Sequence, residues 1–179
     1  MASVLKVNEL QHTGGTSALT VDSSGRVNHP ALPAMHWQGG NEGNVSVANG
    51  ENFFATNDGQ ATAYTDGTYL SFIQGGMTYT ATTGRFTVPI DGVYHISCTI
   101  YVNEDGQTAR MNGQVNGTTR FLAHNSLNNS SPSSRGSHTV TATVKLTGGD
   151  YITFENGSGH TIALYQGIGH TYGNIHLVG

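Results

Sequence analysis

The alternation of side chains over residues 93–102 is the feature that most constrains the fold. The even-numbered residues from 94 to 102 are Tyr, Ile, Cys, Ile and Val, whereas residues 95, 97 and 99 are His, Ser and Thr. A period of two places these sets on opposite faces of an extended strand. Nowhere along the chain do apolar residues spaced three or four apart persist beyond two helical turns. The pattern therefore predicts a half-buried β-strand and disfavours a helical fold.

Similar segments recur along the chain, separated by turn-forming residues. Val140, Ala142, Val144 and Leu146 alternate with polar residues, and further strands are expected at 151–154, 162–165 and 173–178. Gly and Asn or Asp stand at the breaks between them, as tight turns require. About eight to ten strands are expected from Met35 onward, which is typical of an antiparallel sandwich or barrel. The polar segment 125–137 is expected to be an exposed loop.

Composition excludes several classes of protein. Only 10% of the residues are charged, against about 25% in ordinary soluble proteins. The net charge of −4 and the 7 Lys and Arg residues argue against a nucleic-acid partner, and no apolar run approaches the ~20 residues of a membrane span. A single cysteine excludes an internal disulfide framework, and no secretory signal is expected at the N-terminus. A weakly charged surface suits a chain that is covered by copies of itself or by neighbours.

Residues 1–30 are expected to form an arm separate from a head domain at 31–179. The segment 4–10 alternates, and residues 18–27 are typical of a small hairpin with a turn at 22–25. An isolated hairpin is barely stable in water, so another surface is expected to cover its apolar side. The residues expected to dock the arm onto a partner are Val4, Leu5, Val7, Leu10, Leu19, Val21 and Arg26.

Two stretches of the head resemble complement C1q-like domains. Residues 79–97 contain Gly84-Arg85-Phe86-Thr87-Val88-Pro89, followed by a Gly-Val-Tyr-His-Ile-Ser strand at 92–97. Residues 164–178 resemble the last two strands of that family. The resemblance covers about Ala31 to Gly179, and it is weakest over the polar, loop-rich part from Asn103 to Ser137.

This resemblance implies an all-β, antiparallel jelly-roll sandwich of the C1q/tumour-necrosis-factor class, with about ten strands. Domains of that class form threefold-symmetric homotrimers, so a homotrimer is expected here. Cys98 is expected to be buried, as a small hydrophobic residue. The residues expected in core strands or at the trimer interface are Phe86, Tyr94, Ile96, Tyr101, Phe154, Tyr165, Tyr172 and Ile175.

The N-terminal segment resembles a second type of protein. Residues 5–10 and 15–27, followed by Pro30 and 33–35, are similar to the leader of virion structural proteins from tailed bacteriophages. This implies a trimeric capsid decoration or cement protein on the outer surface of the virion, bound to the major capsid protein or another virion protein through residues 1–30. The alternative is a head- or tail-fibre knob that recognises a receptor protein or glycan on the host surface.

No arrangement of residues predicts catalysis, a cofactor or a metal site. No Gly-x-Ser-x-Gly motif surrounds Ser158, although His160 follows it closely, and the glycines at 167–173 do not match a dinucleotide-binding motif. The nine histidines show no clear metal-ligand spacing, and hydrogen bonding at a surface or interface is their expected role. Their protonation would move the net charge from −4 to +5, so we expect trimer or partner contacts to weaken near pH 5.

Overall fold

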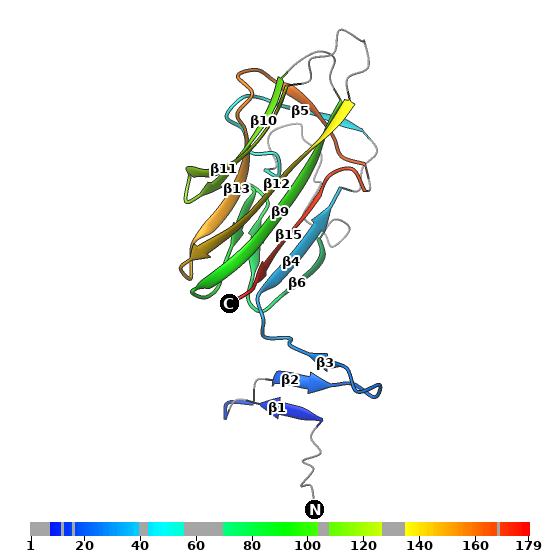
Figure 1. Cartoon of the computed structure of the whole chain (residues 1–179), viewed down its shortest axis with the longest axis vertical. Helices are drawn as coiled ribbons and strands as arrows, with labels where there is room; N and C mark the ends of the chain where they lie inside the picture. Colours follow the sequence, from blue (N-terminus) through cyan, green and yellow to red (C-terminus); the bar gives the residue numbers. More distant parts are fainter. Residues whose placement is uncertain are drawn as a thin grey trace, which may run out of the picture.

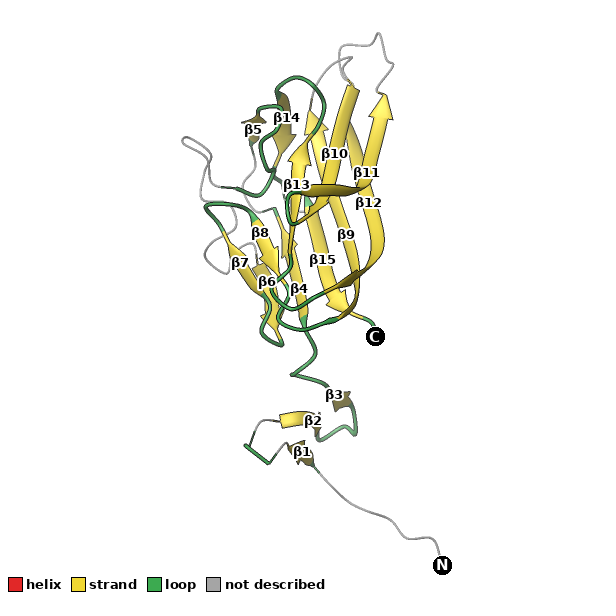
Figure 2. Ribbon diagram, turned by 90° about the vertical axis from the view of Figure 1, so that its left-hand side faces the viewer, coloured by secondary structure: helices red, strands yellow, loops and turns green. Residues whose placement is uncertain are grey.

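The computed structural model describes residues 8–11, 13–15, 17–39, 43–55, 70–103, 108–126, 135–167 and 169–179. These residues form strands and turns and contain no helix (Figures 1 and 2). All strand pairs are antiparallel, and they build three sheets. Two of the sheets belong to the head and the third to the N-terminal arm. The expected all-β, antiparallel architecture is thereby confirmed.

The smaller sheet of the head has five strands in the order β11-β10-β13-β8-β7. Their bounds are β7 Thr78–Thr80, β8 Arg85–Thr87, β10 Thr108–Val115, β11 Thr118–Ser126 and β13 Tyr151–Asn156. The turn between β10 and β11 uses Asn116 and Gly117, both with positive φ (52° and 73°). Asn and Gly are the residues that adopt this conformation most easily, so the local sequence sets the hairpin.

The larger sheet of the head has seven strands. One edge of β9 pairs with β12 along its whole length, while the other edge pairs with β15 at 94–99 and with β14 at 101–102. β15 continues to β4 and β6, and β14 continues to β5. The bounds are β4 Ala34–Gln38, β5 Asn44–Val47, β6 Leu70–Gln74, β9 Gly92–Asn103, β12 Arg135–Leu146, β14 Ile162–Tyr165 and β15 Tyr172–Leu177.

An aromatic cluster forms the centre of the core between the two sheets. The ring centroids of Trp37 and Phe86 are stacked 4.3 Å apart, and Phe54 and Phe154 lie edge-on or tilted at 5.7 Å and 5.9 Å from Trp37. All four side chains are at most 1% exposed. Gly173 lies against this cluster, where an added Cβ would fall 2.2 Å from Trp37 Cζ2. Glycine is needed there because the backbone of β15 passes directly over the indole ring.

The arm forms a small sheet of its own. β1 Glu9–Gln11, β2 Ser17–Val21 and β3 Val27–Asn28 pair only with one another among the described strands. Asp22 closes the turn between β2 and β3: its Oδ1 accepts from the backbone N–H of Ser24 and Arg26, and its Oδ2 lies 2.7 Å from Arg26 Nε. Figure 1 shows this sheet beyond the end of the head at which β4 begins and the C-terminus lies.

The predicted strands at 93–102, 151–154, 162–165 and 173–178 correspond to β9, β13, β14 and β15, with shifts of a few residues at their ends. The head contains twelve strands within the described residues, more than the expected eight to ten. Most of the segment expected as a loop at 125–137 lies outside the described residues, while β11 ends and β12 begins within its flanks. No described helix is long and apolar enough to cross a membrane.

Candidate functional site

The side of the larger sheet that faces away from the core is the strongest candidate for a functional surface. The register aligns its side chains in rows: His95 lies opposite Thr143 and His176, and Ser97 lies opposite Thr141 and Asn174. We call the central part of this surface the uncharged face; it comprises Ala34, His36, Gln38, Phe72, Gln74, His95, Ser97, Thr99, Tyr101, Thr139, Thr141, Thr143, Tyr165, Tyr172, Asn174 and His176. Lys145, opposite Val93 at the end of β12, lies on the same side of the sheet and is outside this set.

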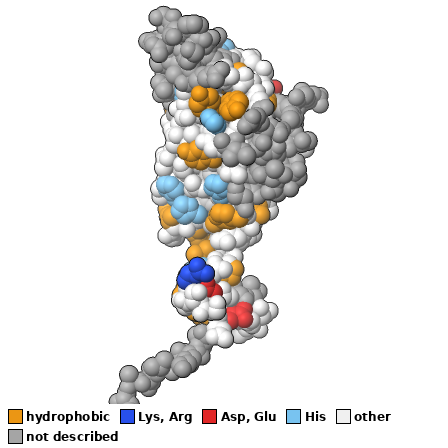
Figure 3. Space-filling view, turned by 90° about the vertical axis from the view of Figure 1, so that its right-hand side faces the viewer, with side chains coloured by type: hydrophobic (Ala, Val, Ile, Leu, Met, Phe, Trp, Pro, Cys, Tyr) orange, Lys and Arg blue, Asp and Glu red, His pale blue; other side chains and the backbone are white. Residues whose placement is uncertain are grey.

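Charged side chains are scarce on this side of the sheet: among the side chains that the structure describes there, Lys145 at the end of β12 is charged, and the uncharged face itself contains no Lys, Arg, Asp or Glu. Figure 3 shows histidine and hydrophobic side chains gathered on the head among uncharged polar ones, whereas the visible Lys, Arg, Asp and Glu side chains lie mainly on the arm. Phe72 and Tyr172 are 48% and 40% exposed, although both are large aromatic residues. Depletion of charge together with exposed aromatic rings is the composition of an interface core.

Hydroxyl pairs join β9 to β12 across this face. Thr99 Oγ1 and Thr139 Oγ1 lie 2.8 Å apart, and Ser97 Oγ and Thr141 Oγ1 lie 3.4 Å apart. Cross-strand hydroxyl pairs of this kind stabilise neighbouring strands and satisfy polar groups locally. The face can therefore be covered by another protein surface without leaving these hydroxyls unpaired.

Three rings cluster where β9 meets β14. Tyr101 lies 6.0 Å from Tyr165 and 5.0 Å from His170, and Tyr165 lies 5.1 Å from His170, all in edge-to-face geometry. The buried Thr171 hydroxyl donates to the Tyr165 carbonyl (2.8 Å) and accepts from the Tyr101 backbone N–H (3.3 Å). These bonds fix the backbone beneath the rings, so the aromatic cluster is held in one arrangement.

Two histidines lie side by side at the other end of the face. The ring centroids of His95 and His176 are 5.1 Å apart. Partial burial lowers the pKa of His176, and the neighbouring His95 lowers it further by repulsion between the charged forms. His36 lies on β4 and stacks against Phe72 at 6.2 Å. The contact with His95 therefore favours the neutral form of His176.

The residues predicted for core strands or the trimer interface divide into two groups. Tyr101, Tyr165 and Tyr172 lie on the uncharged face. The others are at most 1% exposed and point into the core, so a second subunit cannot touch their side chains: Phe86, Tyr94, Ile96, Phe154 and Ile175. Cys98 is also buried, and burial raises the pKa of its thiol well above the ordinary value.

The predicted docking residues of the arm are only partly described. Val4, Leu5 and Val7 lie outside the described residues. Leu10 is 58% exposed on β1, while Leu19 and Val21 are half-buried on β2. The Arg26 side chain is exposed and pairs with Asp22, so its visible contact is within the turn. Sequence reasoning did not single out Val27, which is 54% exposed on β3.

No group of three or more His, Cys, Asp or Glu side chains is placed to hold a metal ion in the described part of the chain. A polar hollow on the smaller sheet was missed by sequence reasoning, because its lining residues come from β8, β10, β13 and three connecting segments. No local motif links those segments, and only the folded arrangement brings them together.

Comparison with solved structures identifies the class of fold. Eiger TNF from S. frugiperda superposes with a TM-score of 0.69 at 17% sequence identity, covering 83% of this chain and 94% of that chain. Murine APRIL, in a crystal structure at pH 5.0, gives a TM-score of 0.58 at 16% identity, covering 82% of this chain and 99% of that chain. The head therefore has a TNF-like jelly-roll fold, as the C1q/tumour-necrosis-factor resemblance implied.

No family model matches this sequence, and no curated protein matches it either.

Proposed function

We propose that the chain is a homotrimeric structural protein, not an enzyme, and that its three heads associate through the uncharged face. The observation that carries this proposal is the scarcity of charge on a sheet face that exposes Phe72 and Tyr172, with Lys145 at the end of β12 outside its central part. In an isolated monomer this aromatic area would stay in contact with water, whereas burial between subunits removes it from water and stabilises the trimer. The resemblance to C1q-like domains and the TNF-like fold support a threefold arrangement.

Within this proposal, the arm attaches the trimer to a larger particle. Leu10 and Val27 expose apolar side chains on β1 and β3, and Leu32, in the link to β4, is 44% exposed. Three arms on one trimer would bind a multivalent surface with increased avidity, without any single contact being strong. The leader resemblance supports a virion of a tailed bacteriophage as that particle, with the trimer as a capsid decoration or cement protein on its outer surface.

The alternative is a knob at the tip of a head or tail fibre that recognises the host. The polar hollow on the smaller sheet favours this second function, since that sheet is separate from the uncharged face. Copy number separates the two, because a decoration protein would be present in hundreds of copies per virion and a fibre knob in a few to a few dozen. Quantitative mass spectrometry of purified virions measures this number directly.

Solution mass tests the trimer on which both functions rest. The full chain is expected to have a mass of about 56 kDa, three times the 18.8 kDa of one chain. Sedimentation equilibrium or light scattering gives this value independently of shape. A stable monomer at micromolar concentration would contradict the proposal.

Attachment through the arm is tested with the full-length protein and capsids that lack it. Leu10→Asp together with Val27→Asp should abolish capsid binding and leave the trimer mass unchanged, because both side chains are more than half exposed. Leu122→Asp is the matched control, since Leu122 is 52% exposed on β11 of the head. Equal binding by the double variant and the control would show that the arm does not carry attachment.

A further inference from the structure

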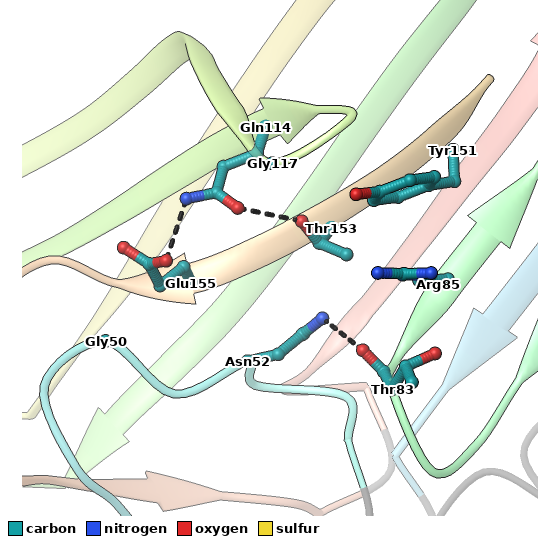
Figure 4. A pocket seen from close by; sticks show the side chains of 9 residues that line it. All are labelled: Gly50, Asn52, Thr83, Arg85, Gln114, Gly117, Tyr151, Thr153 and Glu155. Atoms are coloured by element: carbon teal, nitrogen blue, oxygen red, sulfur yellow. Dashed lines mark hydrogen bonds between the residues drawn. The ribbon is translucent and has the colours of Figure 1, made fainter.

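A hollow of about 210 Å³ opens on the smaller sheet, on the side away from the core. Its walls come from β13 (Tyr151, Thr153 and Glu155), from Gln114 on β10, and from Arg85 on β8. Asn52 and the turn before β8 close the opposite side (Figure 4). The residues between those of β13, Ile152 and Phe154, point into the core and are fully buried. The floor of the hollow is therefore anchored in the core of the sandwich.

Hydrogen bonds hold the carboxylate of this hollow in place. Gln114 Nε2 donates to Glu155 Oε2 at 2.8 Å, and the Thr153 hydroxyl donates to Gln114 Oε1 at 3.1 Å. On the other side, Asn112 Nδ2 donates to Glu155 Oε1 at 3.1 Å. Thr153 and Asn112 are each 7% exposed, so the network is largely buried beneath the hollow. A carboxylate has about four acceptor positions, so Glu155 keeps acceptor capacity for a ligand.

The cation of the hollow is positioned by an aromatic ring. The Arg85 guanidinium lies over the Tyr151 ring, 4.0 Å from its centroid. This contact orients the planar group but uses none of its five N–H donors. Asn52 is held across the hollow by donating to the carbonyls of Thr83 (3.0 Å) and Gly84 (3.1 Å). Fixed donors and fixed acceptors therefore surround the same small space.

We infer that this hollow binds one ring of a neutral sugar through its hydroxyl groups. Each sugar hydroxyl donates and accepts, so hydroxyls on opposite sides of one ring can donate to Glu155 at one end of the hollow and accept from Arg85 at the other (Figure 4). The formal charges of these two residues cancel, and the remaining lining groups are uncharged, which disfavours an anionic ligand. The volume suits a single ring whose remaining chain stays in solvent. This binding deepens the alternative function, recognition of the host surface, by naming the ligand class and its site, and it requires neither the trimer nor attachment through the arm.

The test is a titration of the full-length protein, followed by NMR, with methyl glycosides of glucose, galactose, mannose and N-acetylglucosamine. At least one should bind saturably with a dissociation constant of roughly 1–50 mM, the range expected for a small, open site. N-acetylneuraminic acid, which carries a carboxylate, should bind more weakly. Absence of saturable binding by all four glycosides, or tighter binding of the acid, overturns the inference.

Variants place the binding at the hollow. Arg85→Met keeps an aliphatic stem against Tyr151 and removes the donors, so it should weaken binding at least about tenfold. Arg120→Met is the matched control, an exposed arginine on β11 of the same sheet that does not line the hollow. Unchanged binding by Arg85→Met, with a melting temperature equal to that of the wild type, shows that the sugar binds elsewhere and overturns the inference. A deficient trimer with normal sugar binding would contradict only the proposed function.

Discussion

His95 and His176 face each other on adjacent strands of the larger sheet, with their ring centroids 5.1 Å apart. Their other neighbours along this row are Thr143 and Ala34, so no carboxylate in the row compensates a second positive charge. The pKa of His176 is lowered from its ordinary value of 6.5 by burial and by His95. Protonation of His176 therefore opposes the folded state.

The first prediction concerns stability at mildly acidic pH. Because the pKa of His176 is lower in the folded than in the unfolded chain, the unfolded chain binds more protons on acidification. The free energy of unfolding should be constant above about pH 6.5 and decrease below it, as pH falls toward the folded pKa. His176→Gln should make this decrease shallower, as measured by denaturant titration between pH 7.5 and 5.

The control for this effect is His29→Gln, which changes an exposed histidine between β3 and β4. It should leave the pH dependence as in the wild type. If His176→Gln and His29→Gln give the same profile as the wild type, the His95–His176 contact does not contribute to acid sensitivity.

A second prediction follows from the place of Tyr172 at the middle of the uncharged face, between Thr99 and Gln38. Tyr172→Glu would bury an unpaired carboxylate in each of three subunits, which is strongly unfavourable. The variant should sediment as a folded monomer of 18.8 kDa at micromolar concentration. Thr78→Glu, on exposed strand β7 of the other sheet, should remain trimeric. Trimers of equal stability in both variants would place the interface elsewhere.

A third prediction concerns the close approach of β15 to the indole ring. In Gly173→Ala, the new methyl group would fall 2.2 Å from Trp37 Cζ2 and 2.7 Å from the Ser97 carbonyl oxygen. The backbone must move, so unfolding should become easier by about 1–3 kcal/mol. Gly43→Ala is the control, since an added Cβ there meets no atom within 4 Å. Equal melting temperatures for both variants would mean that β15 moves away from the indole ring without loss of stability, and would contradict this prediction.

The fourth prediction concerns the single cysteine. The Cys98 side chain is 0% exposed, and burial raises the pKa of its thiol well above the ordinary value. The thiolate is the reactive form, so the native protein should not react with a thiol reagent. The denatured protein should react with one equivalent of the reagent per chain, since the chain has one cysteine. Rapid labelling of the native protein would indicate that β9 opens readily.

The period-two pattern of residues 93–102 was sufficient to predict which side chains of β9 are buried, because alternation is a local property of one strand. The pairing partners of β9 are β12, β14 and β15, which come from distant parts of the chain, and nothing local specifies them. For the same reason the sequence could not separate Tyr165 and Tyr172 from Phe86, with which they were predicted in one set. The two tyrosines lie on the side of the larger sheet that faces away from the core, whereas Phe86 is buried in it. The hollow around Arg85 and Glu155 depends on contacts between segments 70 residues apart and has no local signal.

The last prediction separates the core from the interface, which the sequence pattern treated as one set. Phe86 is 1% exposed and stacks on Trp37 and on Tyr79 at 4.3 Å and 5.0 Å. Phe86→Ala should lower the free energy of unfolding by about 3–5 kcal/mol, since it removes a large buried ring and leaves a cavity. Tyr172→Phe keeps the ring and removes only a hydroxyl from outside the core of the subunit, so it should change this free energy by less than about 1 kcal/mol. Phe86→Ala is measured by urea denaturation in the monomeric Tyr172→Glu background, so that subunit association does not contribute to its value. Tyr172→Phe is measured by urea denaturation in the otherwise wild-type protein. A loss below about 1 kcal/mol for Phe86→Ala would show that the ring is not part of the folded monomer's core.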